Sequence, residues 1–213
     1  MAPIDVDSIL RELQNRQPIF HSEADFQHAL AWEIHTRYPN ATVRLEIHPG
    51  RIGPREYIDI WVKHGDAICV IELKYKTRKL DAIWNGEEFH LLNQGAQDIG
   101  RYDFIKDVVR VERFVTGHPM ASGYAVLLTN DDTYWRTTTR LDTADSSFRI
   151  HDDRELSGAL RWSEATGPGT MRGRENPLIL TNLHRIHWID YSELPEKGPN
   201  KFRYALLRIE SPQ

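Results

Sequence analysis

The chain is poor in cysteine, in long apolar runs and in net positive charge, and each shortage excludes a class of protein. Its single cysteine cannot form an internal disulfide, and its place inside AICVIEL is typical of a small core residue. No apolar run approaches the roughly 20 residues that a membrane-spanning helix needs. The N-terminal MAPIDVDSILRELQNR lacks the layout of a signal peptide. We therefore expect a cytoplasmic protein without a membrane partner.

The net charge and the histidines exclude further classes. A net charge of −4 provides no global attraction to nucleic acid, so any such contact must come from local patches. The ten histidines include one close pair, His184 and His187, which we interpret as part of a strand or turn and not as a zinc motif.

The composition fits one ordinary globular domain over residues 1–213, because hydrophobic residues make up 40% of the chain and charged residues 27%. We expect a core over about residues 20–130 and a loop-rich insertion, with a mobile loop, over about 132–176. Strand-like sequence returns over about 177–210, where a closing hairpin is expected to extend the sheet.

Helical spacing marks two regions of the expected core. Phe26, Leu30 and Ile34 form an apolar stripe after a helix-capping signal at Ser22, so a helix is predicted there, preceded by a shorter one. Apolar positions at helical spacing also run through residues 87–115, and they predict one long helix with an interruption in its first half.

A β-hairpin is predicted between these helices. The strand-like runs at residues 57–62 and 67–73 flank KHGDA, whose Gly-Asp pair suits a two-residue hairpin turn. With that pair at the turn, Asp59 lies directly opposite Glu72. Side chains alternate between the two faces of a strand. One face of the hairpin is then wholly apolar: Ile58, Ile60, Val62, Cys69, Ile71 and Leu73.

The other face of the hairpin carries Asp59, Glu72 and Lys74 beside Trp61 and Val70. Like charges opposed across roughly 5 Å destabilise a sheet unless something neutralises them, and a divalent cation would do so. The alternative is a solvated polar face on which Glu72 and Lys74 pair along the strand. Because three charges meet on a partly apolar face, we favour the cation site.

The order of these residues resembles that of the PD-(D/E)XK nuclease superfamily, over roughly Glu23 to Asn130. The resemblance is carried by Glu23 in a helix, by Asp59 in the first strand of the hairpin, and by the triplet Glu72-Leu73-Lys74, which follows an apolar run in the second strand. It departs from the superfamily at Ile58, where the family name expects proline. The resemblance implies a restriction-endonuclease-like fold, an α/β mixed sheet flanked by helices.

The resemblance also implies a role for each of these residues. Asp59 and Glu72 correspond to ligands of Mg²⁺, with Mn²⁺ as an alternative, and the Leu73 carbonyl to a third oxygen. Oxygen-only ligands favour these ions over zinc. Lys74 corresponds to the residue that orients or deprotonates the attacking water. Glu23 resembles a helix glutamate that completes the metal shell, although a first-turn glutamate is also explained by the helix dipole.

The following helix contributes further candidates. Gln94 and Gln97 resemble a glutamine found there in several subfamilies, with Tyr102 as its companion, and their spacing predicts a shared helical face with at least one side chain at the site. Basic residues flank the hairpin and either hold phosphates or form a solvated surface: Arg51, Arg55, Lys76, Arg78 and Lys79.

These features predict a magnesium-dependent nuclease that hydrolyses phosphodiester bonds, with DNA as the expected partner and a homodimer allowed. One alternative is an inactive subunit of the same fold that binds nucleic acid or supports assembly, although the intact Asp59, Glu72 and Lys74 set argues against it. Another is a protein-interaction module whose paired acids are surface charge.

Overall fold

The computed structural model describes residues 3–48, 56–140 and 142–210. The strands of its main sheet are β1 (Thr42–Ile47), β2 (Ile58–His64), β3 (Ala67–Lys76), β6 (Ala121–Thr129), β9 (Trp188–Glu193) and β10 (Lys201–Glu210). The other elements are α1 (Val6–Arg16), α2 (Glu23–Arg37), α3 (Gln97–Thr116), α4 (Pro168–Met171), β4 (Leu80–Trp84), β5 (Glu87–Leu91), β7 (Glu155–Leu160), β8 (Leu178–Arg185) and a short 3-10 turn (Ser146–Phe148).

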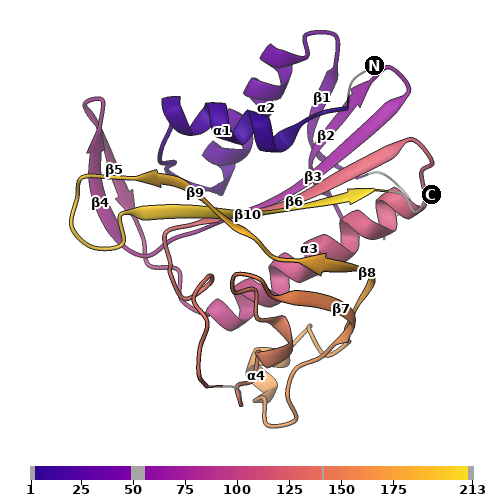
Figure 1. Ribbon diagram of the computed structural model, residues 1–213, viewed down its shortest axis with the longest axis vertical. Helices are drawn as coiled ribbons and strands as arrows, with labels where there is room; N and C mark the ends of the chain where they lie inside the picture. The colour runs from indigo at the N-terminus through magenta and orange to yellow at the C-terminus, as the bar shows by residue number, and fades with distance from the viewer. Residues whose placement is uncertain (1–2, 49–55, 141, 211–213) are drawn as a thin grey trace.

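The main sheet has six strands in the order β1-β2-β3-β6-β10-β9 and lies between two layers of helix (Figure 1). Helices α1 and α2 cover one face, and α3 covers the other. Only β3 and β6 run parallel, because α3 connects them as a crossover; the other neighbours are antiparallel. The expected mixed α/β sheet with flanking helices is confirmed.

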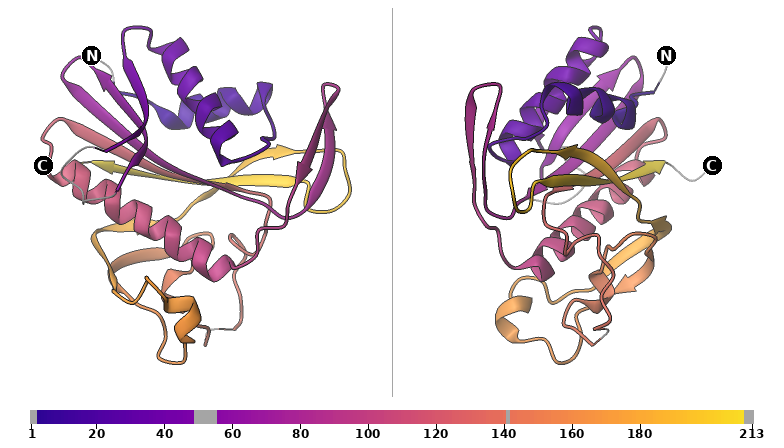
Figure 2. Two further views of the ribbon diagram at one scale, coloured as in Figure 1. Left: turned by 180° about the vertical axis from the view of Figure 1, so that it is seen from behind. Right: turned by 60° about the vertical axis from the view of Figure 1, so that its left-hand side comes forward.

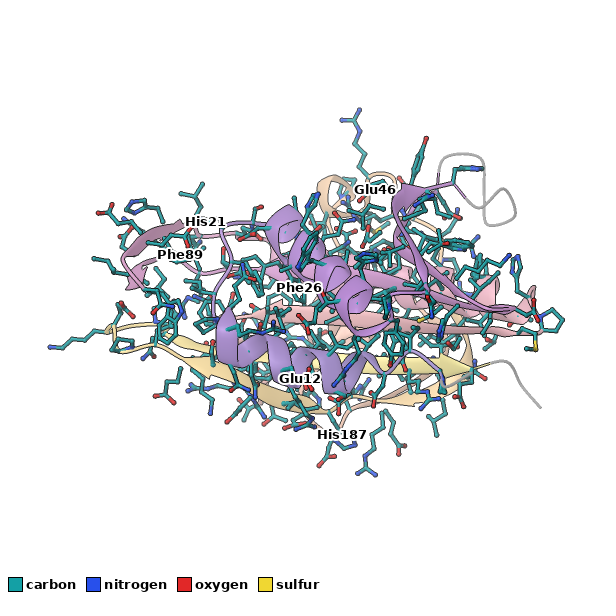
Figure 3. The ribbon with its side chains drawn as sticks, turned by 90° about the horizontal axis from the view of Figure 1, so that it is seen from above. Glu12, His21, Phe26, Glu46, Phe89 and His187 are labelled. Carbon is teal, nitrogen blue, oxygen red and sulfur yellow. The ribbon has the colours of Figure 1, made fainter. Side chains whose placement is uncertain are left out.

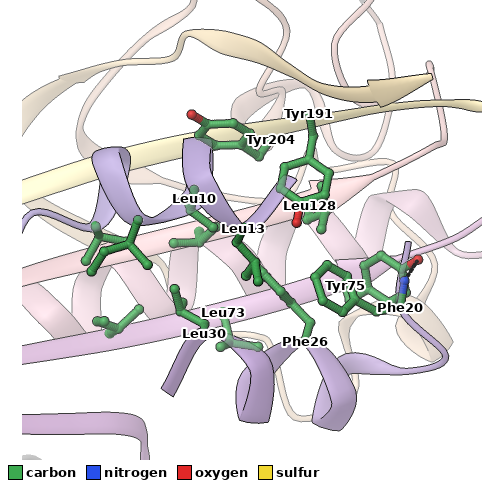
Figure 4. Close-up of a cluster of buried hydrophobic side chains, with 14 of the residues drawn as sticks. Leu10, Leu13, Phe20, Phe26, Leu30, Leu73, Tyr75, Leu128, Tyr191 and Tyr204 are labelled. Carbon is green, nitrogen blue, oxygen red and sulfur yellow. Dashed lines mark hydrogen bonds between the residues drawn. The ribbon is translucent and has the colours of Figure 1, made fainter. Parts of the chain in front are cut away.

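The predicted helix after Ser22 is present as α2. Its N-cap is Ser22, whose side chain accepts a hydrogen bond from the Asp25 N–H. Phe26, Leu30 and Ile34 are fully buried and pack with Leu73 and other residues of the sheet in one large core (Figure 4). The spacing of these apolar residues thus fixes which side of α2 faces the strands.

The β2–β3 hairpin has the predicted register, with Val62 opposite Cys69 and Ile60 opposite Ile71. The ladder ends at Ile60 and Ile71, so it does not include the predicted pairing of Asp59 with Glu72. The predicted side of Ile58 is also wrong. Ile60 and Val62 pack under α1 and α2, but Ile58 joins the apolar cluster under α3. The β1–β2 pairing skips Asp59, between Ile60 and Ile58, so the ladder is irregular at that residue.

The helix predicted over residues 87–115 is wrong in its first part. Residues 80–91 form the β4–β5 hairpin, which projects from the body of the molecule (Figures 1 and 2). Its turn is Asn85-Gly86, where both residues have positive φ, as hairpin turns of this length require. The ring of His21 stacks on Phe89 at 4.2 Å and anchors the hairpin (Figure 3).

The segment expected to be a loop-rich insertion packs on the side of α3 away from the sheet (Figure 2). It contains β7, which pairs with β8 in a separate two-stranded sheet, so β8 does not extend the main sheet as expected. The extension is made by the β9–β10 hairpin. Among the described residues, no helix has the length and apolar character needed to span a membrane.

Candidate functional site

Strands β2 and β3 separate near the middle of β3, and the candidate site lies in the resulting opening, which we call the fork. The pairing of β2 with β3 ends at Ile60 and Ile71. Beyond this point, the Leu73 N–H donates to Asp59 Oδ2 at 2.8 Å, and the Tyr75 N–H donates to Glu23 Oε2 at 2.8 Å. Two carboxylates therefore replace the backbone acceptors that a paired strand would supply.

Helix α2 and strand β1 hold the fork open. One turn after Glu23, the buried Gln27 amide donates from Nε2 to the Asp59 carbonyl at 2.8 Å and to Glu46 Oε1 at 2.7 Å. Glu46 has a φ of 50°, which is uncommon for a residue with a side chain and marks local strain beside Asp59. The Asp59 carbonyl thus points to α2 and away from the β-ladder.

Helix α3 closes the other side of the fork with Asp107 and Arg110. The Lys74 Nζ lies 2.9 Å from Asp107 Oδ2, 3.1 Å from the Leu73 carbonyl oxygen and 3.9 Å from Glu23 Oε1. Arg110 Nη1 lies 3.1 Å from Asp107 Oδ1. Charged groups from α2, β3 and α3 therefore meet around the ammonium of Lys74.

Glu72 is completely buried beside this network. Its Oε1 forms an ion pair with Arg110 Nη1 at 2.7 Å, but neither carboxylate oxygen has a hydrogen-bond donor in good geometry among the described residues. Burial, followed by the charges of Asp107 and Asp59, raises the pKa of Glu72 well above its usual range, against the opposing effect of Arg110. A buried carboxylate oxygen without a donor is costly, and a cation would relieve that cost.

Asp59 and Lys74 have shifted pKa values as well. Burial raises the pKa of Asp59 to about 6, although Lys74 and the Leu73 N–H oppose the shift. Burial would lower the pKa of Lys74, but the surrounding carboxylates, Asp107 foremost, outweigh it and raise the pKa. The fork therefore holds a firmly charged ammonium beside two acids that resist ionisation.

The predicted core of the site is largely brought together. The Leu73 backbone joins two of them, because its N–H donates to Asp59 Oδ2 and its carbonyl accepts from Lys74 Nζ, and Glu72 directly precedes Leu73 on β3. Glu23 faces the fork as expected, through Lys74 and the Tyr75 N–H.

The predicted glutamines are not brought to the fork. Helix α3 begins at Gln97, so Gln94 lies before the helix and the shared helical face is wrong. Gln97 Nε2 donates to Asp131 Oδ2 at 2.9 Å, and Gln97 lies about three turns before Asp107. Tyr102 is buried against Trp162, with ring centroids 5.4 Å apart.

Three of the basic residues predicted to hold phosphates are described, and they lie at the end of β3 and just after it. Arg51 and Arg55 lie outside the described residues. Lys76 ends β3 and Lys79 is exposed after it. Arg78 Nη1 lies 3.6 Å from Asp132 Oδ1, and the Arg78 N–H donates to the Asn130 side chain at 2.7 Å. Their role as phosphate contacts stays a prediction.

Sequence reasoning missed four residues of the fork: Gln27, Glu46, Asp107 and Arg110. A signal existed for the last two, because Asp107 and Arg110 are three residues apart among the buried residues Ile105, Val108 and Val111 of one helix. Charges three apart share a helical face. No local pattern points to Gln27 or Glu46, whose roles depend on the arrangement of α2 and β1.

The donor set of the fork fits a cation that prefers oxygen. Asp59 and Glu72 supply carboxylate oxygens, and the Leu73 carbonyl oxygen lies in the fork beside Lys74. Glu72 Oε2 has no hydrogen-bond donor among the described residues. In the described part of the chain, no three His, Cys, Asp or Glu side chains stand together as a ready ligand set. Arg110 and Lys74 occupy the neighbourhood of the carboxylates.

Comparisons of the chain with family models, with characterised proteins and with solved structures found no significant match. The function is therefore argued from the geometry of the fork itself.

Proposed function

We propose that the protein is a nuclease of the restriction-endonuclease-like fold that uses Mg²⁺ or Mn²⁺ to hydrolyse phosphodiester bonds, with DNA as its substrate. The observation that carries the proposal is the fork, where the Asp59 carboxylate, the Leu73 carbonyl and the Lys74 ammonium meet at an unpaired strand edge beside buried Glu72. Burying charges of both signs at an unpaired strand edge costs free energy, and such arrangements concentrate at functional sites.

Each residue has a distinct part in this proposal. The ion would be held by Asp59, Glu72 and the Leu73 carbonyl. Glu23 would act indirectly, through its hydrogen bond to the Tyr75 N–H at the edge of β3. When bound, the ion supplies positive charge to the phosphate and lowers the pKa of a water molecule. Lys74 orients the attacking water and stabilises charge that develops on the phosphate. Asp107 positions Lys74, since their charged atoms lie 2.9 Å apart.

Arg110 has two roles in this arrangement. It neutralises Glu72 in the absence of an ion, because Nη1 lies 2.7 Å from the carboxylate. If Glu72 instead held an ion, the Arg110 guanidinium would be free to bind a phosphate oxygen, which its planar donor geometry suits.

Incubation of the purified protein with plasmid, linear and single-stranded DNA, and with RNA, tests the proposal. Cleavage is expected with Mg²⁺ or Mn²⁺ and not with EDTA. Absence of cleavage of every substrate, combined with metal-independent binding of DNA, would instead support the inactive subunit. Absence of both cleavage and binding would support the protein-interaction module.

Two substitutions should fail in different ways. Asp59→Asn removes a negative ligand and its repulsion with Glu72, so metal affinity should fall while the metal-free protein becomes no less stable. Lys74→Ala leaves the carboxylates in place, so metal should still bind while cleavage drops on the order of 10²-fold or more. Calorimetric metal titration beside cleavage assays separates the two.

Asp66→Asn and Lys63→Ala are matched controls, because both residues are exposed and lie at or near the hairpin turn, away from the fork. Both variants should bind metal and cleave like the parent. Unchanged cleavage by Lys74→Ala, or unchanged metal affinity of Asp59→Asn, would contradict the role given to that residue.

A further inference from the structure

A second polar site lies in the segment between β6 and β7, on the side of α3 opposite the main sheet (Figures 1 and 2). A cavity of about 270 Å³ is lined there by Arg140, Arg149, Arg154 and His151. The remaining lining residues are two threonines and two serines between residues 138 and 147. Every described residue that lines the cavity is thus a hydrogen-bond donor, and none is acidic.

The positive charge of this cavity is only partly compensated. Asp145 is buried and lies 2.6 Å from Arg101 Nη1 and 3.2 Å from Arg149 Nη2, so one carboxylate serves two guanidinium groups. Arg140 and Arg154 form no ion pair with any described residue. Burial, followed by the charge of Arg101, lowers the pKa of Arg149, as expected where cations are crowded.

Two donors in the cavity are buried without acceptors. The Nε atoms of Arg149 and Arg154 have no hydrogen-bond partner among the described residues. Arg149 is nevertheless held in place, because Nη2 donates to Thr143 Oγ1 at 3.0 Å as well as pairing with Asp145. A buried donor atom without an acceptor costs free energy unless a ligand supplies one.

We propose that this cavity binds a phosphate group, carried either by a nucleic-acid backbone or by a free nucleotide. Phosphate supplies several acceptor oxygens and negative charge, which match guanidinium donors in geometry and sign. The inference does not depend on the proposed nuclease activity, because none of the cavity residues belongs to the fork. If the nuclease activity is also present, the cavity gives the substrate a second contact beyond α3.

The test compares binding by the parent, by Arg140→Ala/Arg154→Ala, and by a control, Arg161→Ala/Arg172→Ala. Arg161 and Arg172 are exposed, lie in the same insertion and do not line the cavity, so both double variants lose the same charge. Binding of pyrophosphate, a mononucleotide and a labelled DNA oligonucleotide is measured in EDTA at constant ionic strength, so a metal ion at the fork does not contribute. Acetate serves as the competing anion.

Affinity is expected to fall on the order of tenfold or more in the cavity variant and less than about twofold in the control. A loss for the oligonucleotide alone identifies the nucleic-acid backbone as the source of the phosphate, and a loss for mononucleotide and pyrophosphate identifies a free nucleotide.

Three results would overturn the phosphate site. They are equal affinities in all three proteins, absence of binding by the parent, and competition by acetate as strong as by pyrophosphate. Phosphate binding without any metal-dependent cleavage would leave this site standing and remove the proposed nuclease. The two proposals therefore fail by different results.

Discussion

Asp107 is the residue of the fork whose function follows most directly from its contacts. It is buried, and its two carboxylate oxygens lie 2.9 Å from Lys74 Nζ and 3.1 Å from Arg110 Nη1. In the proposed nuclease both partners are cations that would face the phosphate, so Asp107 would set their positions without contacting the substrate itself. Positioning residues of this kind commonly affect activity nearly as strongly as the groups they hold.

We predict that Asp107→Asn lowers cleavage by about 10- to 100-fold while metal binding changes little, because Lys74 and Arg110 lose their shared anion but the ion ligands remain. Asp107→Glu should recover part of the activity, since it restores the charge. Cleavage rates and calorimetric metal titrations measure the two effects. Asp103→Asn, one turn earlier on α3, is the matched control and should cleave like the parent.

The raised pKa of Asp59, about 6 against an ordinary 3.8, predicts how stability depends on pH. In the metal-free protein, the Asp59 carboxyl holds its proton more tightly in the folded state than in the unfolded state. The contribution of Asp59 to stability therefore falls as pH rises from about 4 to about 6, and it stays low above that.

Asp59→Asn removes this titration, so the variant should gain about 1–3 kcal/mol relative to the parent between pH 4 and pH 7. Urea unfolding in EDTA at the two pH values measures the difference. A constant difference between variant and parent would show that Asp59 does not titrate in this range.

At the scale of elements, the packing of α3 on the sheet depends on Gly123 of β6. A methyl group at Gly123 would lie 2.2 Å from Val111 Cγ1 and 3.2 Å from both Val115 Cγ2 and Val70 Cγ2. The absence of a side chain therefore allows α3 to approach β6 and brings Asp107 and Arg110 over β3.

Gly123→Ala should destabilise the protein by about 1–3 kcal/mol, because the added methyl overpacks this contact. It should also weaken metal binding if α3 shifts as a unit. Chemical denaturation gives the stability change. Gly117→Ala is the control: its nearest atoms beyond the neighbouring residues are 3.5 Å or more away, and its φ is −82°. An equal loss in both variants would refute the steric explanation.

At the scale of the whole molecule, Glu112 joins the β7–β8 sheet to the core. Its buried carboxylate accepts the N–H groups of Thr181 and Asn182, both at 2.9 Å, and lies 2.8 Å from His184 Nε2. These donors make the pKa of Glu112 lower than usual, even though burial opposes the shift. One side chain of α3 thus ties down strand β8.

Glu112→Ala should cost about 2–4 kcal/mol, because it leaves several buried donors without an acceptor. The amides of β7 and β8 should then exchange with solvent faster than those of β3 and β6 when hydrogen exchange is measured. Glu155→Ala, an exposed change on β7, should have little effect. Uniform acceleration across both sheets would mean that the β7–β8 sheet does not open separately.

Local patterns in the sequence were sufficient for α2 and for the register of the β2–β3 hairpin. The apolar stripe of α2 and the Gly65-Asp66 turn involve neighbouring residues only, so spacing determines them. The same logic, applied without attention to Asn85-Gly86, predicted a helix from residue 87 onward, where strand β5 of the β4–β5 hairpin forms. A two-residue turn signal there outweighed apolar spacing that suited either structure.

The sequence by itself predicted Asp59, Glu72 and Lys74 on one face of a hairpin, because a two-residue turn sets the register of the strands that follow it. Only the tertiary structure decided that β2 and β3 part at this point and that Asp107 and Arg110 enter from α3. These contacts depend on a parallel crossover and on close packing at Gly123, which join residues more than thirty positions apart. Periodicity describes only near neighbours, so it carries no information about which distant charges a folded chain brings together.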